Sequence, residues 1–267
     1  MPVILIQDLT KRFGPRAAVD TFSLAVEPGE IFGLLGPNGA GKSTMLKMLT
    51  TLLPSSSGRA AIAGYDIQRQ PMEVQRRIGY VPQALSVDGT LTGYENMLIL
   101  AKLYGVRRRQ RLERIWSALQ YVGLDTVAHR LVNTYSGGMI RRLEIAQATL
   151  HQPLVLFLDE PTVGLDPIAR KAMWDLILQL RRDHNTTVFL TTHFMDEADV
   201  LCDRLAILYQ GQQVAIGTPT TLKAAIPQAD ATLDDVFIHY TGNYLVTQAE
   251  GGYHDTSTTR RSAKRLG

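Results

Sequence analysis

The chain has 267 residues, of which 45% are hydrophobic and 20% are charged, the composition of an ordinary globular protein. No apolar stretch approaches the roughly 20 residues of a membrane-spanning helix, and no basic segment precedes the first apolar residues, so we expect neither a membrane span nor a secretory signal. The net charge of +3 owes two charges to residues 241–267 (four basic against two acidic side chains), and the single Cys202 excludes an internal disulfide and fits a reducing cytoplasm.

Short strands are expected at the start of the chain. Runs of β-type residues alternate there with turn signals, and Pro28-Gly29 separates two of the runs. The expected strands are Val3–Leu9, Val19–Val26, Ile31–Leu35 and Ala60–Tyr65.

The region from about Leu91 to Leu150 is expected to be helical. Apolar residues recur there at helical spacing, as at Met97, Leu98 and Ala101. A region of this character between two groups of strands predicts a helical insert.

An α/β core is expected after the insert. Leu154–Leu158 and Val188–Leu190 are continuous apolar runs, typical of parallel strands that are buried on both faces, and Ile168–Asp183 reads as a helix between them. Strand, helix and strand in this order predict a right-handed crossover. A short β pair is expected around Leu205–Tyr209 and Gln213–Ile216.

A glycine-rich segment between a strand and a helix predicts a phosphate-binding loop. It reads Gly36-Pro37-Asn38-Gly39-Ala40-Gly41-Lys42-Ser43-Thr44, between the strand Ile31–Leu35 and the helix Met45–Leu49. Its glycines let backbone N–H groups wrap phosphate oxygens at the positive end of a helix. Lys42 can reach the β- and γ-phosphates, and the Ser43 hydroxyl can bind Mg²⁺. Thr44 can donate to a phosphate further back.

Two acids and a histidine are expected at the same edge of the sheet. Asp159 and Glu160 end the strand Leu154–Leu158, and His193 ends the strand Thr187–Thr192. Ligands of open α/β sheets bind at this carboxyl edge. Asp159 would hold Mg²⁺, Glu160 would polarise a water that attacks the γ-phosphate, and His193 would orient that water.

Four further segments accompany these residues in a fixed order. They are Phe13; Gln83 in Gly79-Tyr80-Val81-Pro82-Gln83; Tyr135-Ser136-Gly137-Gly138-Met139; and Gly164-Leu165-Asp166. Over about residues 3–217 the set resembles ATP-binding-cassette ATPases. In that resemblance Phe13 stacks on adenine, and Gln83 is the Q-loop glutamine, which contacts Mg²⁺ and senses a membrane partner. The Ser136 segment is the family signature, and the Asp166 segment is the D-loop.

The resemblance implies an α/β fold with a P-loop NTPase core, an antiparallel β subdomain and an inserted α-helical subdomain. Residues 1–84 and 151–220 would form the core with the β subdomain, and residues 85–150 would form the helical subdomain that carries the signature. Residues 221–241 would be a C-terminal appendage, and residues 242–267 a disordered tail.

The implied site residues fall into three groups. The catalytic residues would be Lys42, Glu160 and His193. The Mg²⁺ ligands would be Ser43, Gln83 and Asp159. The ATP-binding residues would be Phe13, Gly36, Pro37, Asn38, Gly39, Ala40, Gly41, Lys42, Ser43, Thr44, Gln83, Ser136, Gly137, Gly138, Asp159 and Asp166.

Three positions depart from the family pattern. Tyr135 and Met139 stand where Leu and Gln are usual, and Phe13 replaces the commoner Tyr. Ser136 can still cap the following helix and aim N–H groups at a phosphate. Met139 cannot donate the hydrogen bond of a glutamine, so the departure bears on the rate of turnover rather than on ATP binding.

The resemblance also implies partners. Two cassettes would sandwich two ATP molecules head to tail, with the second cassette from another copy (a homodimer) or a paralogue. A separate transmembrane permease would dock around Leu85–Tyr94 and hold the protein peripherally at the cytoplasmic face of the plasma membrane. Residues Thr232–Gly242 resemble the ending of daunorubicin-resistance-type cassettes, which implies export of drugs or other amphipathic compounds.

Two rival functions are weaker. A soluble mechanical ATPase acting on nucleic acid or ribosomes would usually carry a long coiled-coil insert or two cassettes, and neither is present. The basic run Arg107-Arg108-Arg109 has no interleaved aromatic residues for base stacking, so a solvated helix face is expected there and no nucleic-acid partner. A regulator that binds ATP without hydrolysing it is disfavoured by the intact Lys42 and Glu160.

Overall fold

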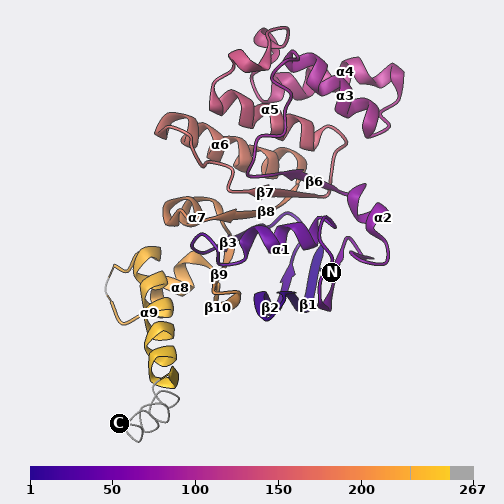
Figure 1. Cartoon of the computed structure of the whole chain (residues 1–267). Coiled ribbons are helices and arrows are strands. Elements are labelled where there is room, and N and C mark those ends of the chain that lie inside the picture. Colours follow the sequence, from indigo (N-terminus) through magenta and orange to yellow (C-terminus); the bar gives the residue numbers. More distant parts are fainter. Residues whose placement is uncertain (229, 253–267) are drawn as a thin grey trace, which may run out of the picture.

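A computed structural model describes residues 1–228 and 230–252, without the side chains of residues 243–252 (Figure 1). The strands are β1 (Ile4–Phe13), β2 (Arg16–Val26), β3 (Ile31–Leu35), β4 (Ser57–Ile62), β5 (Tyr65–Asp66), β6 (Ile78–Val81), β7 (Val155–Asp159), β8 (Thr187–Thr192), β9 (Arg204–Tyr209) and β10 (Gln212–Gly217). The α-helices are α1 (Lys42–Leu49), α2 (Pro71–Gln75), α3 (Gly93–Leu103), α4 (Arg108–Tyr121), α5 (Gly137–Thr149), α6 (Pro167–His184), α7 (Met195–Leu201), α8 (Pro219–Ala224) and α9 (Leu233–Gly252).

Two sheets organise these elements. One has six strands in the order β10-β9-β3-β8-β7-β6, all parallel except β10, which pairs antiparallel with β9. The other is antiparallel, in the order β2-β1-β4-β5. Figure 1 shows α3, α4 and α5 gathered beyond β6, the strand at one edge of the larger sheet. The fold therefore joins a parallel core, an antiparallel β part and a helical part, as the resemblance implied.

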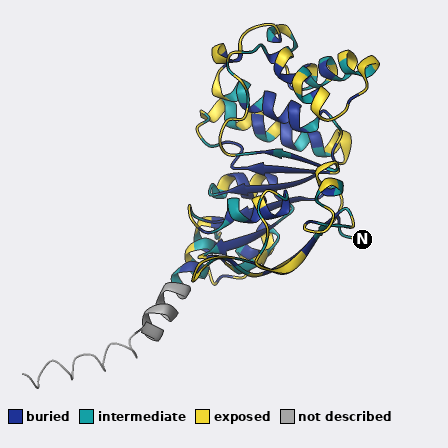
Figure 2. Ribbon diagram, turned by 45° about the vertical axis from the view of Figure 1, so that its right-hand side comes forward, coloured by how far each residue is buried: buried dark blue, intermediate teal, exposed yellow. Residues whose placement is uncertain are grey.

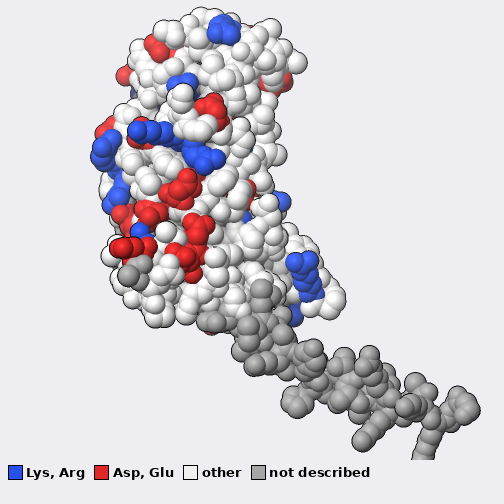
Figure 3. Space-filling model, turned by 90° about the vertical axis from the view of Figure 1, so that its left-hand side faces the viewer, with Lys and Arg blue, Asp and Glu red and all other residues white. Residues whose placement is uncertain are grey.

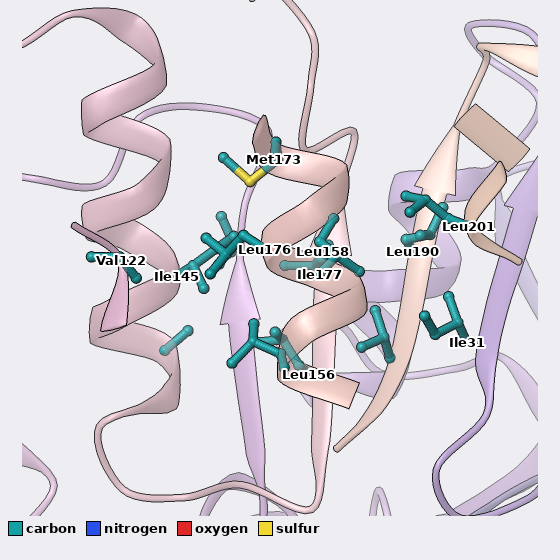
Figure 4. Packing of buried hydrophobic residues seen from close by; sticks show 14 of the residues in the cluster. Ile31, Val122, Ile145, Leu156, Leu158, Met173, Leu176, Ile177, Leu190 and Leu201 are labelled. Atoms are coloured by element: carbon teal, nitrogen blue, oxygen red, sulfur yellow. The ribbon is translucent and has the colours of Figure 1, made fainter. Parts of the chain in front are cut away.

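The parallel strands are buried on both faces because successive side chains point to opposite sides. Ile31 and Leu35 of β3 pack in the cluster that contains the buried faces of α5, α6 and α7. Phe32 and Leu34, between them in the sequence, pack in the cluster that contains α1 and the antiparallel sheet. Figure 4 shows side chains of the first cluster meeting between the strands and the helices, and Figure 2 shows the central strands of the larger sheet in the dark blue of buried residues. Helices α1 and α5 consequently lie on opposite faces of one sheet.

The helical part has its own capping and core. Helix α3 begins with a capping box, in which Thr92 Oγ1 accepts from the Glu95 N–H at 3.2 Å and Glu95 Oε2 accepts from the Thr92 N–H at 2.8 Å. Ile115 of α4 and Leu143 of α5 are fully buried within this part. Each such side chain contributes about 1.5–3 kcal/mol by leaving water.

The structure adds strand β6, which the sequence analysis did not predict, and divides the expected strand Ala60–Tyr65 between β4 and β5. Strand β6 has only four residues, one of them Gly79, and a glycine in so short a run weakens any strand pattern. A methyl group at Gly79 would overlap the carbonyl oxygen of Ala148, so the close approach of α5 accounts for the glycine.

The C-terminal end is also more regular than expected. Helix α9 continues past residue 241, where we expected regular structure to end. Residues 243–250 contain neither proline nor glycine, so nothing local interrupts a helix there. The rest of the expected disordered tail, residues 253–267, lies outside the described residues, and the residue limits of the expected domains stay predictions. None of the described helices is both long enough and apolar enough to cross a bilayer.

Candidate nucleotide-binding site

The predicted phosphate loop connects the end of β3 to the start of α1. Its first glycine, Gly36, donates its N–H to the Thr192 carbonyl at 3.2 Å, which ties the loop to β8. A methyl group at Gly36 would overlap the Leu208 carbonyl oxygen. Gly41 has a φ of +111°, and a methyl group there would overlap the Ala18 carbonyl oxygen. Both glycines are therefore required by close backbone approaches and, at Gly41, by a left-handed conformation.

The loop presents free hydrogen-bond donors at the start of α1. Within the described residues, the backbone N–H groups of Lys42, Ser43 and Thr44 have no acceptor. The first N–H groups of any helix lack partners inside the helix and carry part of the positive end of its dipole. The cradle therefore fits the oxygens of a phosphate group.

Backbone carbonyl groups at the start of the loop hold the Lys42 side chain in place. Its Nζ donates to the carbonyl oxygens of Gly36 at 2.7 Å and Pro37 at 3.1 Å. Its Nζ also lies 3.1 Å from Glu160 Oε1, and both side chains are only 4% exposed. The ion pair therefore joins the phosphate loop to the acid at the end of β7, and hydrogen bonds compensate the desolvated ammonium group.

Glu160 is the point where the expected catalytic residues meet. Its Oε2 accepts from Gln83 Nε2 at 3.2 Å and lies 3.2 Å from His193 Nδ1, without the angle of a hydrogen bond. Its φ is +51°, a left-handed conformation that a glutamate adopts only where its surroundings enforce it. Its backbone N–H donates to both the carbonyl and the hydroxyl of Thr191 at 3.1 Å, which fixes that conformation.

Asp159 is a buried carboxylate that lies beside the hydroxyl groups of Ser43 and Thr191. It is 2% exposed, and its Oδ1 accepts from Thr191 Oγ1 at 2.6 Å and from Ser43 Oγ at 3.2 Å. Burial, together with the nearby negative charge of Asp159, raises the pKa of Tyr80 to about 12.

The donor groups of the expected Mg²⁺ ligands Ser43, Gln83 and Asp159 fit that ion. A carboxylate, a hydroxyl and the amide oxygen of Gln83 are oxygen donors of the kind that Mg²⁺ prefers. Among the described residues no three His, Cys, Asp or Glu side chains form a metal cluster. A magnesium ion here would therefore draw further oxygens from phosphate groups and water, as this ion usually does.

The expected signature and D-loop residues belong to helices on the face of the larger sheet opposite α1. Ser136 caps α5 by accepting from the Met139 N–H at 3.3 Å, and Asp166 caps α6 by accepting from the Ala169 N–H at 2.9 Å. The Gly138 backbone lies so close to α6 that an added Cβ would come within 3.1 Å of Ala169 Cβ. The starts of α5 and α6 thus adjoin each other, whereas the phosphate loop belongs to the opposite face.

Two of the departures from the family pattern are accommodated by packing. The Tyr135 hydroxyl donates to the Val127 carbonyl at 2.7 Å, and a side chain at Gly93 would collide with that hydroxyl. Met139 packs half-buried against the core around α5. Phe13, at the end of β1, is 53% exposed, and Lys11 Nζ lies 5.2 Å from its ring centre. An exposed aromatic ring at this position is available for stacking.

Sequence reasoning missed three residues that shape the site. Thr191 bonds both acids, and Arg141 and Glu144 of α5 bond the segment around Gln83. Each residue had a signal in the sequence. Thr191 is a polar residue in a buried strand, two residues before His193, and Arg141 and Glu144 are charged residues among the apolar residues of α5. Their partners are distant in the sequence, so the pattern alone could not supply them.

Comparisons with known proteins agree with this geometry. Residues 19–163 match the family described as ABC transporter. The chain is 41% identical over 216 residues to a linearmycin resistance ATP-binding protein of Bacillus subtilis, covering 81% of this chain and 69% of that protein. It is 45% identical over 218 residues to a daunorubicin/doxorubicin resistance ATP-binding protein of Streptomyces peucetius, covering 82% and 66%.

Solved structures are similar as well. The ATP-binding subunit of an ABC transporter matches with a TM-score of 0.79 and 27% identity, over 90% of this chain and 99% of that one. A dimeric ATP-binding cassette in a post-hydrolysis state, bound to ADP and Pi, matches with a TM-score of 0.72 and 26% identity, over 80% and 98%.

Proposed function

This chain belongs to the ABC transporter family of ATP-binding proteins, and on that basis we propose that two copies close around Mg-ATP to drive a separate membrane permease that exports amphipathic compounds. The chain binds and hydrolyses ATP, the reaction of its family. The observation that carries the proposal is the meeting of Lys42, Gln83 and His193 around Glu160, next to a loop with free N–H donors.

Each residue of this cluster has a distinct role in the proposal. The Lys42 ammonium group and the free backbone N–H groups of Lys42, Ser43 and Thr44 bind the β- and γ-phosphates. Glu160 polarises the water that attacks the γ-phosphate, and His193 orients that water. Phe13 stacks on the adenine ring. The left-handed backbone of Glu160 holds its carboxylate at the edge of the sheet, where the attack takes place.

Ser43, Gln83 and Asp159 would hold Mg²⁺ beside the phosphates. When bound, the ion neutralises charge on the β- and γ-phosphate oxygens. Thr191 orients Asp159 for this role, because its Oγ1 donates a hydrogen bond to Asp159 Oδ1 at 2.6 Å. Ser43 Oγ lies 3.2 Å from the same oxygen. Ser43, at the start of α1, and Asp159, at the end of β7, would therefore approach the ion together.

A second copy would complete each site. Because α1 and α5 lie on opposite faces of the sheet, the Ser136–Gly138 segment of one chain faces away from its own phosphate loop. In a head-to-tail pair this segment and Asp166 would meet the ATP that the other copy holds, and a helix N-terminus there favours a γ-phosphate. ATP would thus favour the closed pair, and hydrolysis would release it.

Export is the transport direction that the similarities support. The two relatives described above are named for linearmycin resistance and for daunorubicin/doxorubicin resistance. We therefore propose drugs or other amphipathic compounds as the cargo and a peripheral position at the cytoplasmic face of the plasma membrane, through the permease. No observation favours action on nucleic acid: on the face in Figure 3, basic side chains lie beside acidic ones and form no continuous positive surface.

The Glu160→Gln variant tests the proposal, because it keeps the shape of the site but removes the charge that polarises water. We expect ATP binding to persist, hydrolysis to fall by at least about a hundredfold, and a closed dimer to accumulate with Mg-ATP. Light scattering measures the dimer, and affinity capture from native membranes with mass spectrometry identifies the partner. Capture of a polytopic membrane protein is the expected result.

Two other results would count against parts of the proposal. A protein that stays monomeric at saturating Mg-ATP, with its membrane partner present, would contradict the closed dimer. Capture of ribosomal or DNA-associated proteins, with no membrane protein, would leave the ATPase in place and overturn the transport assignment.

A further inference from the structure

A buried ion pair on α5 has no part in the function described so far. Arg141 Nη1 lies 2.8 Å from Glu144 Oε2, one helical turn away, and the two side chains are 6% and 1% exposed. Buried charges are unfavourable unless they are paired and their remaining hydrogen-bonding groups are satisfied. The other partners of this pair therefore indicate what it does.

Both members of the pair bond to the segment that follows β6. Arg141 Nη1 donates to the Pro82 carbonyl at 2.7 Å, and its Nη2 donates to the Gln83 carbonyl. Glu144 Oε1 accepts from the Ser86 N–H at 2.6 Å and from the Ser86 hydroxyl at 2.9 Å. The pair thus holds both ends of the segment 82–86, whose middle is exposed.

The geometry explains the choice of residues. The guanidinium group is planar and has several N–H donors in a fixed fork, so it can bond two successive carbonyls and a carboxylate at once. A lysine would present a single point charge at the end of a flexible chain. The carboxylate of Glu144 has one oxygen for Arg141 and one for Ser86, so no oxygen is left unused.

The segment held in this way places the Gln83 side chain beside Glu160. The Gln83 backbone is bonded to Arg141, and its side chain donates to Glu160 Oε2 at 3.2 Å. Helix α5, which carries Arg141, begins at the segment capped by Ser136. A continuous set of bonded groups therefore connects the start of α5 with the carboxylate that polarises water.

We propose that Arg141 and Glu144 are positioning residues that fix Gln83 relative to α5, so that a displacement of α5 moves Gln83 against Glu160. This inference rests on the proposed function, in which Ser136–Gly138 contact the ATP of the second copy. ATP bound by one copy would then shift α5 of the other and, through Arg141, set the arrangement of its catalytic groups. Hydrolysis in each copy thereby depends on closure of the pair.

The test is a double substitution, Arg141→Met with Glu144→Leu. Replacing both charges with apolar side chains of similar volume avoids leaving one buried charge unpaired, so the protein is expected to fold. The matched control is Arg204→Met with Glu30→Leu, because that pair, at 3.1 Å, joins β9 to the residue before β3 and does not touch segment 82–86.

The measurements are kcat and KM for ATP, and ATP-induced dimer formation in the Glu160→Gln background. We expect the double variant to lose at least about tenfold in kcat, with KM changed by less than about twofold, because the phosphate loop is intact. Dimer formation is expected to persist, and the control is expected to keep both constants.

Three results would overturn the inference. An unchanged kcat in the folded double variant would mean that the pair does not position Gln83. An equal fall in kcat in the control would mean a general loss of stability. A rise in KM that accounts for the whole loss would mean damaged binding. Failure of the proposed function is seen separately, since Glu160→Gln alone, with the pair intact, would then form no dimer.

Discussion

Glu197, on α7, is a buried carboxyl group that the proposed reaction leaves unused. It is completely buried, and its Oε1 accepts from Thr162 Oγ1 at 2.7 Å and from Trp174 Nε1 at 3.0 Å. Burial raises its pKa, and the hydrogen bonds from Thr162 and Trp174 offset only part of that effect. Because the pKa of Glu197 is higher in the folded chain than in the unfolded one, folding takes up a proton near this residue.

The sign of the resulting pH dependence follows directly. A raised pKa contributes stability that is fully present below the unfolded pKa, about 4.3, and is lost as the pH rises through the folded pKa. Glu197→Gln removes this contribution. We expect the variant to gain stability relative to the unmodified protein between about pH 5 and about pH 8, as measured by denaturant unfolding.

Glu95→Gln is the control for this experiment. The Thr92 hydrogen bonds lower the pKa of Glu95, so its contribution is present above the unfolded pKa and is lost only as the pH falls through the lower folded value. Its substitution should therefore have nearly the same effect at both pH values. An equal response of the two variants to pH would contradict the assignment to Glu197.

At the scale of single residues, the sequence predicted a set of groups that the structure brings together and missed the residues that hold them. Lys42, Asp159 and Glu160 stand in patterns that are short and local, and the structure brings them together. Arg141 reaches Gln83 across 58 residues, and Thr191 reaches Asp159 across 32. Only a known fold supplies contacts of that kind.

Thr92 and Ser136 each cap a helix of the helical part with a hydroxyl group, but of these two only Ser136 belongs to the proposed site. We expect Thr92→Ala to cost about 1 kcal/mol through loss of the α3 cap and to lower the Tm by about 2–4 °C, without changing ATP hydrolysis by the isolated subunit. Ser136→Ala removes the α5 cap at a similar cost. In this variant hydrolysis is also expected to fall, because the Ser136 hydroxyl would face the nucleotide of the second copy.

Calorimetry and a steady-state ATPase assay separate these expectations. If Thr92→Ala lowered activity as much as Ser136→Ala did, the loss would reflect the helical part as a whole, and Ser136 would have no special role. If both variants kept full activity, the place of Ser136 in the site would be contradicted.

At the scale of elements, continuous runs were predictable even when short, as for β3, which was expected and found at Ile31–Leu35, whereas interrupted patterns were not. Helix α6 runs from Pro167 to His184, close to the expected 168–183, because its apolar residues keep a helical period over several turns. Strand β6 was missed because four residues with a glycine give no alternation to count. The expected strand Val3–Leu9 ended four residues before β1 does, because the last residues of β1 lie after a bulge that breaks the alternating pattern.

The fold of the whole chain was predictable because the order of elements restricts it. Continuous apolar strands separated by helices require a parallel sheet with covered faces. The sequence could not predict which face each helix covers, since that depends on the register of strands such as β3 and β8. That placement separates α1 from α5, and the proposed dimer follows from it.

A site divided in this way between two chains has a consequence for mixtures of defective proteins. Lys42→Ala damages the loop of its own chain, and Ser136→Arg damages the signature that its chain offers to a neighbour. Pairs made of either variant alone contain no intact site. A pair with one of each contains an intact loop opposite an intact signature, so the two inactive proteins complement each other.

Unfolding and refolding an equal mixture should therefore restore ATP hydrolysis. Random pairing gives about a quarter of the intact sites of the same amount of unmodified protein. A mixture that stayed inactive, although cross-linking detected mixed pairs, would place the loop and the signature of each working site in one chain. Recovery would instead make the pair, rather than the polypeptide, the smallest unit on which selection for this activity can act.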